Sequence, residues 1–197
     1  ISGLSIIKEV EGTITIKNSY TGGTLTGLDN ITKIGGLSIG SEENPAANET
    51  LEMVSMTKLN EVTGNIHVYN NGVKFVQFDL LKAIEGDFVI SSSTLTTLQI
   101  PELINVGGAL NIFGMGKGAI STLVFPKVQT VKNSLSINEI STLKSISFPE
   151  LIETGSINFS SLPIEFEKLS MPKLSVVNGD CFIISNYIQG DLFSTTG

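Results

Sequence analysis

The sequence contains no arginine and no tryptophan, and its 197 residues include one cysteine and one histidine. All 12 basic residues are lysines, against 19 acidic residues, so the net charge is −7. Nucleic-acid and phosphate sites depend on arginine forks and basic stripes, and we therefore expect no nucleic-acid partner. Because Cys181 stands alone, no internal disulfide can form, which excludes a disulfide-stapled miniprotein.

Long apolar runs and helical periodicity are also missing. No stretch of 18 or more apolar residues occurs, so we expect no membrane insertion by this segment. No stretch keeps a period of 3.6 residues for two turns, which argues against long helices. Apolar residues instead alternate at period two within short segments, a pattern typical of strands with one buried face.

A short phrase of the form Gly-x-apolar-x-apolar-x recurs eight times and organises the chain. It is clearest at Gly64–Tyr69 and Gly86–Ser91. The glycine column falls at Gly12, Gly35, Gly64, Gly86, Gly108, Asn133, Gly155 and Gly179, with steps of 23, 29, 22, 22, 25, 22 and 24 residues. A period in the twenties indicates a solenoid, whose turns cover one another's apolar sides. A column that accepts only Gly and Asn predicts a corner with positive φ.

Each coil has three apolar segments, and in four coils a proline follows the second segment. The prolines are Pro101, Pro126, Pro149 and Pro172, and earlier coils carry Thr57 and Asp79 at this place. Proline is disfavoured inside a paired strand, so this column predicts a second corner. Like segments of successive coils pair in parallel, and the crossover rule favours a right-handed path. We therefore predict an all-β, right-handed parallel β-solenoid of about eight coils of 22–29 residues, forming a single domain over 1–197.

The inward positions of the main sheet follow from the glycine column. Two residues per coil point into the interior: Ile14 and Ile16, Leu37 and Ile39, Ile66 and Val68, Phe88 and Ile90, Leu110 and Ile112, Leu135 and Ile137, Ile157 and Phe159, Cys181 and Ile183. Cys181 is thus predicted to be a buried, inert thiol.

The phrase Leu-x-x-Ile/Leu-x-Phe-Pro-x-Leu-x-x-Val-x-Gly-x-Leu-x-Ile resembles the receptor L-domain type of leucine-rich-repeat solenoid. It is also similar to repeats of fungal cell-wall glycoproteins and of bacterial surface proteins, including the BspA type. The resemblance runs from about Leu4 to Tyr187, but the L-domain disulfides and the BspA Ala-Phe and Cys signature are absent. It implies an extracellular or cell-surface protein for adhesion or ligand capture, of which this chain is a piece, with any export signal or anchor outside it.

The outward positions of the main sheet are where a ligand would bind. They are mostly small polar groups with a few aromatic ones, and the candidate binding residues are His67, Tyr69, Asn111, Phe113 and Asn138. His67 and Tyr69 lie two coils from Asn111 and Phe113, about 10 Å along the stack. Such an aromatic and amide patch suits a sugar ring or a loop of a protein partner. The alternative is an ordinary solvated sheet face.

Catalysis is not expected. His67 is the only histidine, so no Ser or Cys nucleophile has a second histidine as its base. The outward columns contain no carboxylate pair for glycoside cleavage. Two alternatives to a binding module remain open: a structural spacer, and a polysaccharide-active β-helix enzyme. We expect no cofactor, a monomer, and a protein or glycan ligand.

Loops and sequons give further expectations. Insertions at 19–23, 41–50 and 114–119 all follow a main strand, so we expect them along one edge, often the binding side of a repeat protein. The acidic segment 41–50 lacks the alternating ligands of a calcium loop and predicts no metal site. Glycosylation sequons begin at Asn30, Asn48 and Asn158.

Overall fold

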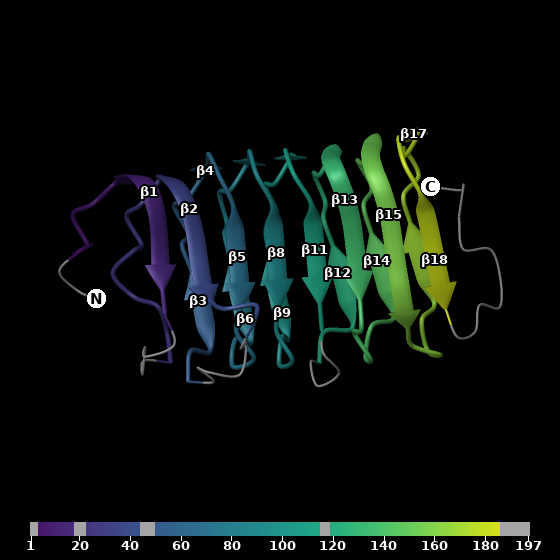
Figure 1. Cartoon of the computed structure of the whole chain (residues 1–197), viewed down its shortest axis with the longest axis horizontal. Helices are drawn as coiled ribbons and strands as arrows, with labels where there is room; N and C mark the ends of the chain where they lie inside the picture. Colours follow the sequence, from purple (N-terminus) through teal and green to yellow (C-terminus); the bar gives the residue numbers. More distant parts are fainter. Residues whose placement is uncertain (1–3, 18–22, 44–49, 115–118, 186–197) are drawn as a thin grey trace.

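The chain forms one long stack of β-coils, with its strands side by side across the molecule (Figure 1). The computed structural model describes residues 4–17, 23–43, 50–114 and 119–185. No α-helix occurs in these ranges, and every strand pairing within them is parallel. The all-β, parallel β-solenoid predicted from the repeat is therefore confirmed.

The main sheet has twelve strands, of which eight follow the glycine column, one per coil, with about seven turns from the first to the last. These eight are β1 (Glu9–Ile16), β2 (Lys33–Gly40), β5 (Ile66–Tyr69), β8 (Phe88–Ser91), β11 (Leu110–Phe113), β13 (Thr130–Asn138), β15 (Glu153–Leu162) and β18 (Cys181–Ser185). Their register joins Ile14, Leu37, Ile66, Phe88, Leu110, Leu135, Ile157 and Cys181 in one row. This row has the spacing of the glycine column, so the predicted register is confirmed.

In the coils of β5, β8, β11 and β18 the other two segments form shorter strands, whereas in β1, β2, β13 and β15 the segment before the glycine column is continuous with the main strand. One set lies just before the glycine column and joins the main sheet: β4 (Glu61–Val62), β7 (Ala83–Ile84), β10 (Asn105–Val106) and β17 (Val176–Val177). The opposite face carries two three-stranded sheets. The first has β3 (Met53–Ser55), β6 (Phe75–Gln77) and β9 (Thr97–Gln99), and the second has β12 (Thr122–Val124), β14 (Ser145–Ser147) and β16 (Lys168–Ser170).

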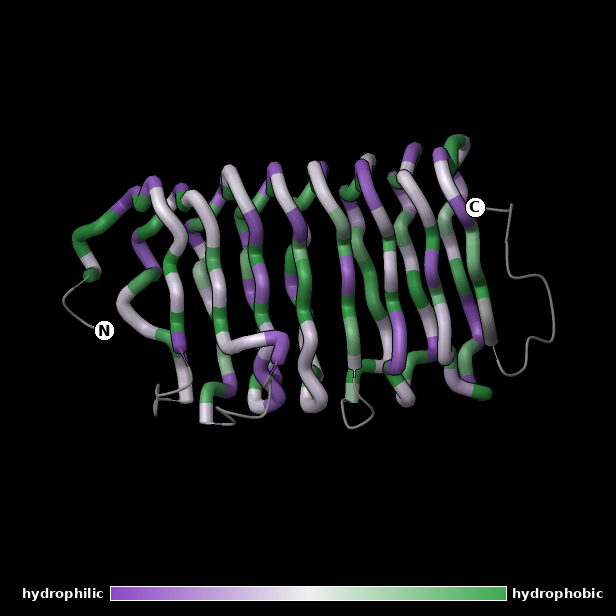
Figure 2. Tube along the Cα trace, viewed as in Figure 1, coloured by the Kyte–Doolittle hydropathy of each residue, from purple (hydrophilic) through white to green (hydrophobic). Residues whose placement is uncertain are grey.

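A continuous apolar core fills the stack, and its side chains come from all three segments. Hydrophobic and hydrophilic residues alternate along the strands (Figure 2), as period-two strands with one buried face require. The residues before the proline column are also buried, and the rings of Phe125 and Phe148 stack with centroids 4.4 Å apart. Pro101, Pro126 and the other prolines of the column each begin a turn, so the predicted second corner is confirmed.

The glycine column has a different cause from the one predicted. The glycines described with positive φ are Gly27 and Gly40, and neither belongs to the column. What excludes a side chain is the neighbouring coil: a Cβ on Gly35 would meet the carbonyl oxygen of Glu11, and one on Gly155 would meet that of Asn133. Asn133 lies where β13 carries one extra residue relative to β15. Close packing of coil on coil therefore selects glycine here.

Cys181 does not have the predicted environment. It pairs with Ile157 in the inward row, as the register requires, yet it is exposed. The reason is its place at the end of the described stack, where β15 covers β18 from one side only. Ile14 in the first coil is likewise only partly buried. Inward direction gives burial only in coils that have a neighbour on both sides.

The ladder on the face opposite the main sheet is interrupted once, between β9 and β12. At the other junctions the residue after the strand donates to the next coil, as Phe78 N–H does to Gln99 O at 2.9 Å and Phe125 N–H to Ser147 O at 2.9 Å. Ile100 makes no such bond among the described residues, and β9 has no pairing with β12. The two coils remain joined on the main-sheet side through β8 and β11. We call this opening the β9–β12 gap.

Candidate functional site

The main sheet carries a hollow of about 490 Å³, formed by the outward side chains of β5, β8 and β11. Strand pairing places His67, Val89 and Asn111 in one row across these strands. A second row, two residues further along, contains Tyr69, Ser91 and Phe113. Four of the five predicted binding residues thus line one depression, which we call the sheet hollow.

The depth of the sheet hollow comes from the difference in side-chain size between its strands. Val89 and Ser91 on the middle strand are short and are 6% and 8% exposed, so they form the floor. His67 and Tyr69 on one side and Phe113 on the other are larger and half-buried, so they form the walls. A row of large, small and large residues on a pleated sheet leaves a trough along the small one.

The walls are partly fixed by contacts within the protein. The rings of His67 and Tyr69 are tilted by 59° with centroids 5.7 Å apart, a geometry favourable for aromatic pairs. On the opposite wall, Ser134 Oγ donates to Asn111 Oδ1 at 3.3 Å, which leaves the amide NH₂ group of Asn111 without a hydrogen bond among the described residues. The sheet hollow therefore presents aromatic surface and one amide donor.

Asn138, the fifth predicted binding residue, is placed differently. It pairs with Phe113 in the second row, but it is 8% exposed and does not line the sheet hollow. Its Nδ2 donates to Ser136 Oγ at 2.7 Å, and its Oδ1 accepts from the backbone N–H and the hydroxyl of Ser160, both at 2.8 Å. Asn138 links three positions of the sheet, and its polar atoms are occupied by that role.

Three carboxylates that were not among the predicted binding residues also line the sheet hollow, and one of them, Glu42, belongs to the acidic segment 41–50 considered above. Asp87 precedes β8, Glu42 follows β2, and Glu139 follows β13. The binding residues were predicted only from the outward columns of the strands, which contain no carboxylate, whereas these three residues flank the strands. Glu139 has φ of 58°, a left-handed conformation uncommon for a residue with a side chain. The absence of carboxylates, used above against catalysis, therefore holds for the strands and not for the hollow as a whole.

Asp87 also has a structural role. Its backbone N–H donates to Asn65 Oδ1 at 2.8 Å, and its own Oδ1 accepts from the backbone N–H of Ala109 at 2.7 Å. The residues after Gly64 and Gly86 thus each hold the next coil by a side-chain hydrogen bond. Asn65 and Asp87 therefore reinforce the coil spacing at the entrance to β5, β8 and β11.

The sheet hollow has a negative electrostatic environment. The pKa of the Tyr69 hydroxyl is raised, first because burial disfavours the phenolate and then because the carboxylates of Glu42 and Asp87 repel it. Tyr69 therefore stays a neutral hydrogen-bond donor to higher pH than a free tyrosine.

This shift can be measured by titration. Tyr20 and Tyr187 can be changed to Phe so that Tyr69 is the remaining tyrosine. We expect the phenolate absorbance to rise with a midpoint above the ordinary value of about 10. Glu42→Gln should lower this midpoint but leave it above that value, because burial is the larger cause. A midpoint at or below the ordinary value would show that Tyr69 is solvated and the hollow open.

Two further expectations from the sequence concern metal sites and membrane insertion. Among the described residues, no group of three or more His, Cys, Asp or Glu side chains is arranged to hold a metal ion. No helix there is long and apolar enough to cross a bilayer. The three insertions follow β1, β2 and β11, but 18–22, 44–49 and 115–118 lie outside the described residues.

Of the sequon asparagines, Asn158 is exposed, Asn30 donates to Ser5 O at 2.6 Å, and Asn48 is not among the described residues.

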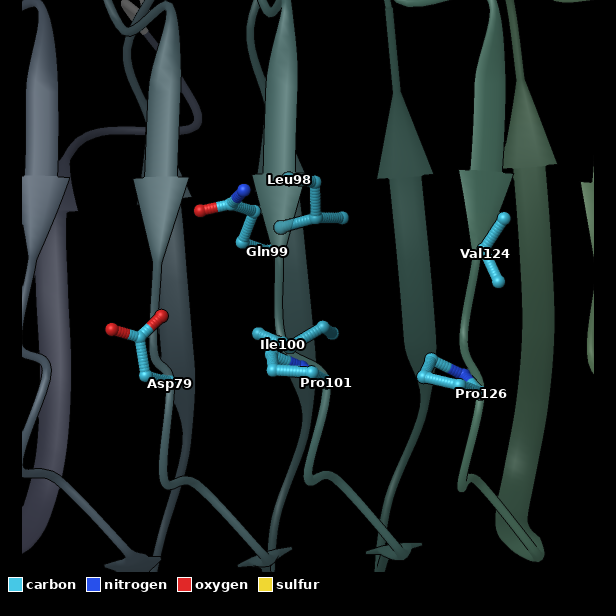
Figure 3. A pocket seen from close by; sticks show the side chains of 7 residues that line it. All are labelled: Asp79, Leu98, Gln99, Ile100, Pro101, Val124 and Pro126. Carbon is cyan, nitrogen blue, oxygen red and sulfur yellow. The ribbon is translucent and has the colours of Figure 1, made fainter.

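A second hollow, of about 290 Å³, lies on the opposite face at the β9–β12 gap. Figure 3 shows Leu98 and Pro101 on one side of it and Val124 and Pro126 on the other. Leu98 occupies the inward position that Val76 and Leu123 occupy in neighbouring coils, yet it is less buried than they are. The gap thus leaves part of the core open on this face.

Comparison with known proteins gives one relevant match. No family model matches the chain, and no solved structure matches it. The cell wall protein ecm33 of Schizosaccharomyces pombe is 30% identical over 125 residues, which are 61% of this chain and 23% of that protein. The chain is distantly related to a fungal cell wall protein. It spans about a quarter of the length of ecm33 in this match. The relation agrees with the resemblance to fungal cell-wall repeats, whereas the likeness to BspA-type proteins stays a prediction.

Proposed function

We propose that this chain is a non-catalytic repeat segment of a cell-surface or secreted protein, and that it binds a protein or glycan partner through the sheet hollow. The single observation that carries this proposal is the gathering of His67, Tyr69, Asn111 and Phe113 around one depression on a regular sheet. Aromatic side chains that are half-buried in a concave site are the usual anchors of binding surfaces.

The cell-surface part of the proposal is supported by the relation to ecm33, which is a cell wall protein. An extended parallel solenoid suits this setting because its flat sheet offers a long surface on which a polymer or a partner domain can lie. A structural spacer would need no hollow. Its role would also not favour aromatic residues on β5 and β11 on either side of small residues on β8.

The test compares two double variants in a binding screen against cell-wall polysaccharides and cell-surface proteins. Tyr69→Ser with Phe113→Ser removes one aromatic ring from each wall and should weaken binding about tenfold or more. Phe75→Ser with Leu80→Ser, two exposed apolar residues away from the hollow, is the matched control and should bind normally. Both proteins should melt near the temperature of the unchanged chain, because the four side chains lie outside the core.

Three results would contradict the proposal. If the control variant lost binding equally, the hollow would not be the site. If the unchanged chain bound no member of either panel, the spacer alternative would replace the proposal. If incubation with the polysaccharides released new reducing ends or unsaturated products, the chain would be an enzyme.

A further inference from the structure

Among the residues that the structure describes, the sheet hollow combines aromatic walls with charge of one sign only. Its centre is lined by Val89 and Phe113, and its ends by carboxylates: Asp87 where the strands begin, Glu42 and Glu139 where they end. No lysine lines it. A ligand that fits this arrangement is apolar in the middle and positively charged where it reaches the carboxylates.

No described lysine forms an ion pair with the carboxylates at the far end, Glu42 and Glu139. Four ion pairs occur between coils of the described chain, and they use Glu52, Glu61, Glu102 and Glu150. Neither Glu42 nor Glu139 belongs to an ion pair or hydrogen bond among the described residues, and both are exposed, so a ligand in the hollow can reach their carboxylates. The raised pKa of Tyr69 supports this, because Glu42 lies close enough to disfavour the phenolate.

A lysine side chain has the form that the hollow requires. Its four methylene groups pack on apolar surface while its ammonium group reaches charged or wet surroundings. The rings of Tyr69 and Phe113 can also stabilise an ammonium group placed over their faces. A metal ion fits less well, since the three carboxylates sit at two ends of the strands and form no converging ligand set among the described residues.

We propose that the partner bound in the sheet hollow is a polypeptide that inserts a lysine side chain between the His67–Tyr69 wall and the Asn111–Phe113 wall, with its ammonium group facing Glu42 and Glu139. This inference rests on the proposed function, because it names the chemistry of the ligand for the same site. It adds that binding depends on the charge of the ligand and weakens as salt rises.

The experiment measures binding of a fluorescent tetralysine peptide and of the same peptide with every side-chain amine acetylated. The unchanged chain should bind tetralysine, with the affinity falling as salt screens the carboxylates, and should bind the acetylated peptide about tenfold or more weakly. Glu42→Gln with Glu139→Gln keeps the size of both side chains and should weaken tetralysine binding about tenfold or more.

The matched control is Glu165→Gln with Glu167→Gln, which makes the same change in net charge at exposed residues outside the hollow. This variant should bind tetralysine like the unchanged chain. Equal weakening in both Gln variants would show non-specific attraction to an acidic protein and would overturn the inference. Equal binding of the acetylated peptide would overturn it as well.

Further arms separate this inference from the proposed function. Binding of a glucosamine oligosaccharide that depends on Glu42 and Glu139, with no binding of tetralysine, would overturn the polypeptide assignment while keeping the site. If Tyr69→Ser with Phe113→Ser abolished capture of a surface ligand and the Glu42 and Glu139 variant did not, the proposed function would stand and the ammonium inference would fail.

Discussion

Replacing Ile112 with aspartate is expected to unfold the middle of the solenoid. Ile112 is fully buried on β11, between Ile90 and Ile137 of the adjacent coils. The change loses burial worth about 1.5–3 kcal/mol. It also places a carboxylate without a partner in an apolar interior, at a further cost of several kcal/mol. Since a domain is stable by about 5–15 kcal/mol in total, the coils around β11 should lose their structure. Circular dichroism and thermal melting would show this loss.

The neighbouring residue provides the control. Asn111→Asp introduces the same side chain one position earlier, on the outward face of β11, where a carboxylate oxygen can still accept from Ser134 Oγ. Its effect on stability should stay within about 0.5 kcal/mol. A full strand signal and an unchanged melting point for Ile112→Asp would contradict the assignment of inward and outward faces.

Adding one methyl group at Gly155 is expected to destabilise the chain by about 1–3 kcal/mol. The new Cβ would meet the backbone carbonyl oxygens of Lys132 and Asn133, and the two coils would have to move apart because backbone atoms cannot rotate out of the way as a long side chain can. Chemical denaturation of Gly155→Ala would give the change in unfolding free energy.

Gly12→Ala is the matched control and should act in the opposite direction. Gly12 belongs to the same column, but it lies in the first described coil, and no atom comes within 4 Å of the position of a Cβ there. The added methyl group mainly restricts the unfolded chain, which typically stabilises a protein by about 0.4–1 kcal/mol. If both substitutions had the same effect, coil packing would not be the reason for the glycine column.

The register of the main sheet could be predicted because every coil obeys the same requirement. An inward Leu, Ile, Val or Phe must lie over its equivalent in the next coil, so the steps between glycines give the strand pairing directly. The cause of the glycine column could not be predicted in the same way. A positive φ and a close neighbouring backbone select the same residue, and one sequence does not distinguish them.

The candidate site could be predicted in part, for a related reason. His67, Tyr69 and Phe113 stand within the repeat phrase, where side chains alternate between inward and outward, so the sequence shows which way each one points. Glu42 and Glu139 lie just after β2 and β13, where the repeat phrase does not show which way a side chain points. Both residues come from coils other than those of β5 and β11, which carry the walls. The buried amide of Asn138 bonds to the hydroxyls of Ser136 and Ser160, and Ser160 comes next to it only in the folded sheet.

The β9–β12 gap has a consequence for the sheet on the other side of the molecule. β9 and β12 belong to the coils of β8 and β11, so the gap lies behind the floor and one wall of the sheet hollow. Between these two coils, β8 pairs with β11 and Ala119 N–H donates to Leu95 O at 3.1 Å, whereas β9 and β12 do not pair. The floor and one wall of the sheet hollow therefore rest on two coils whose strands pair along the main sheet but not along the opposite face.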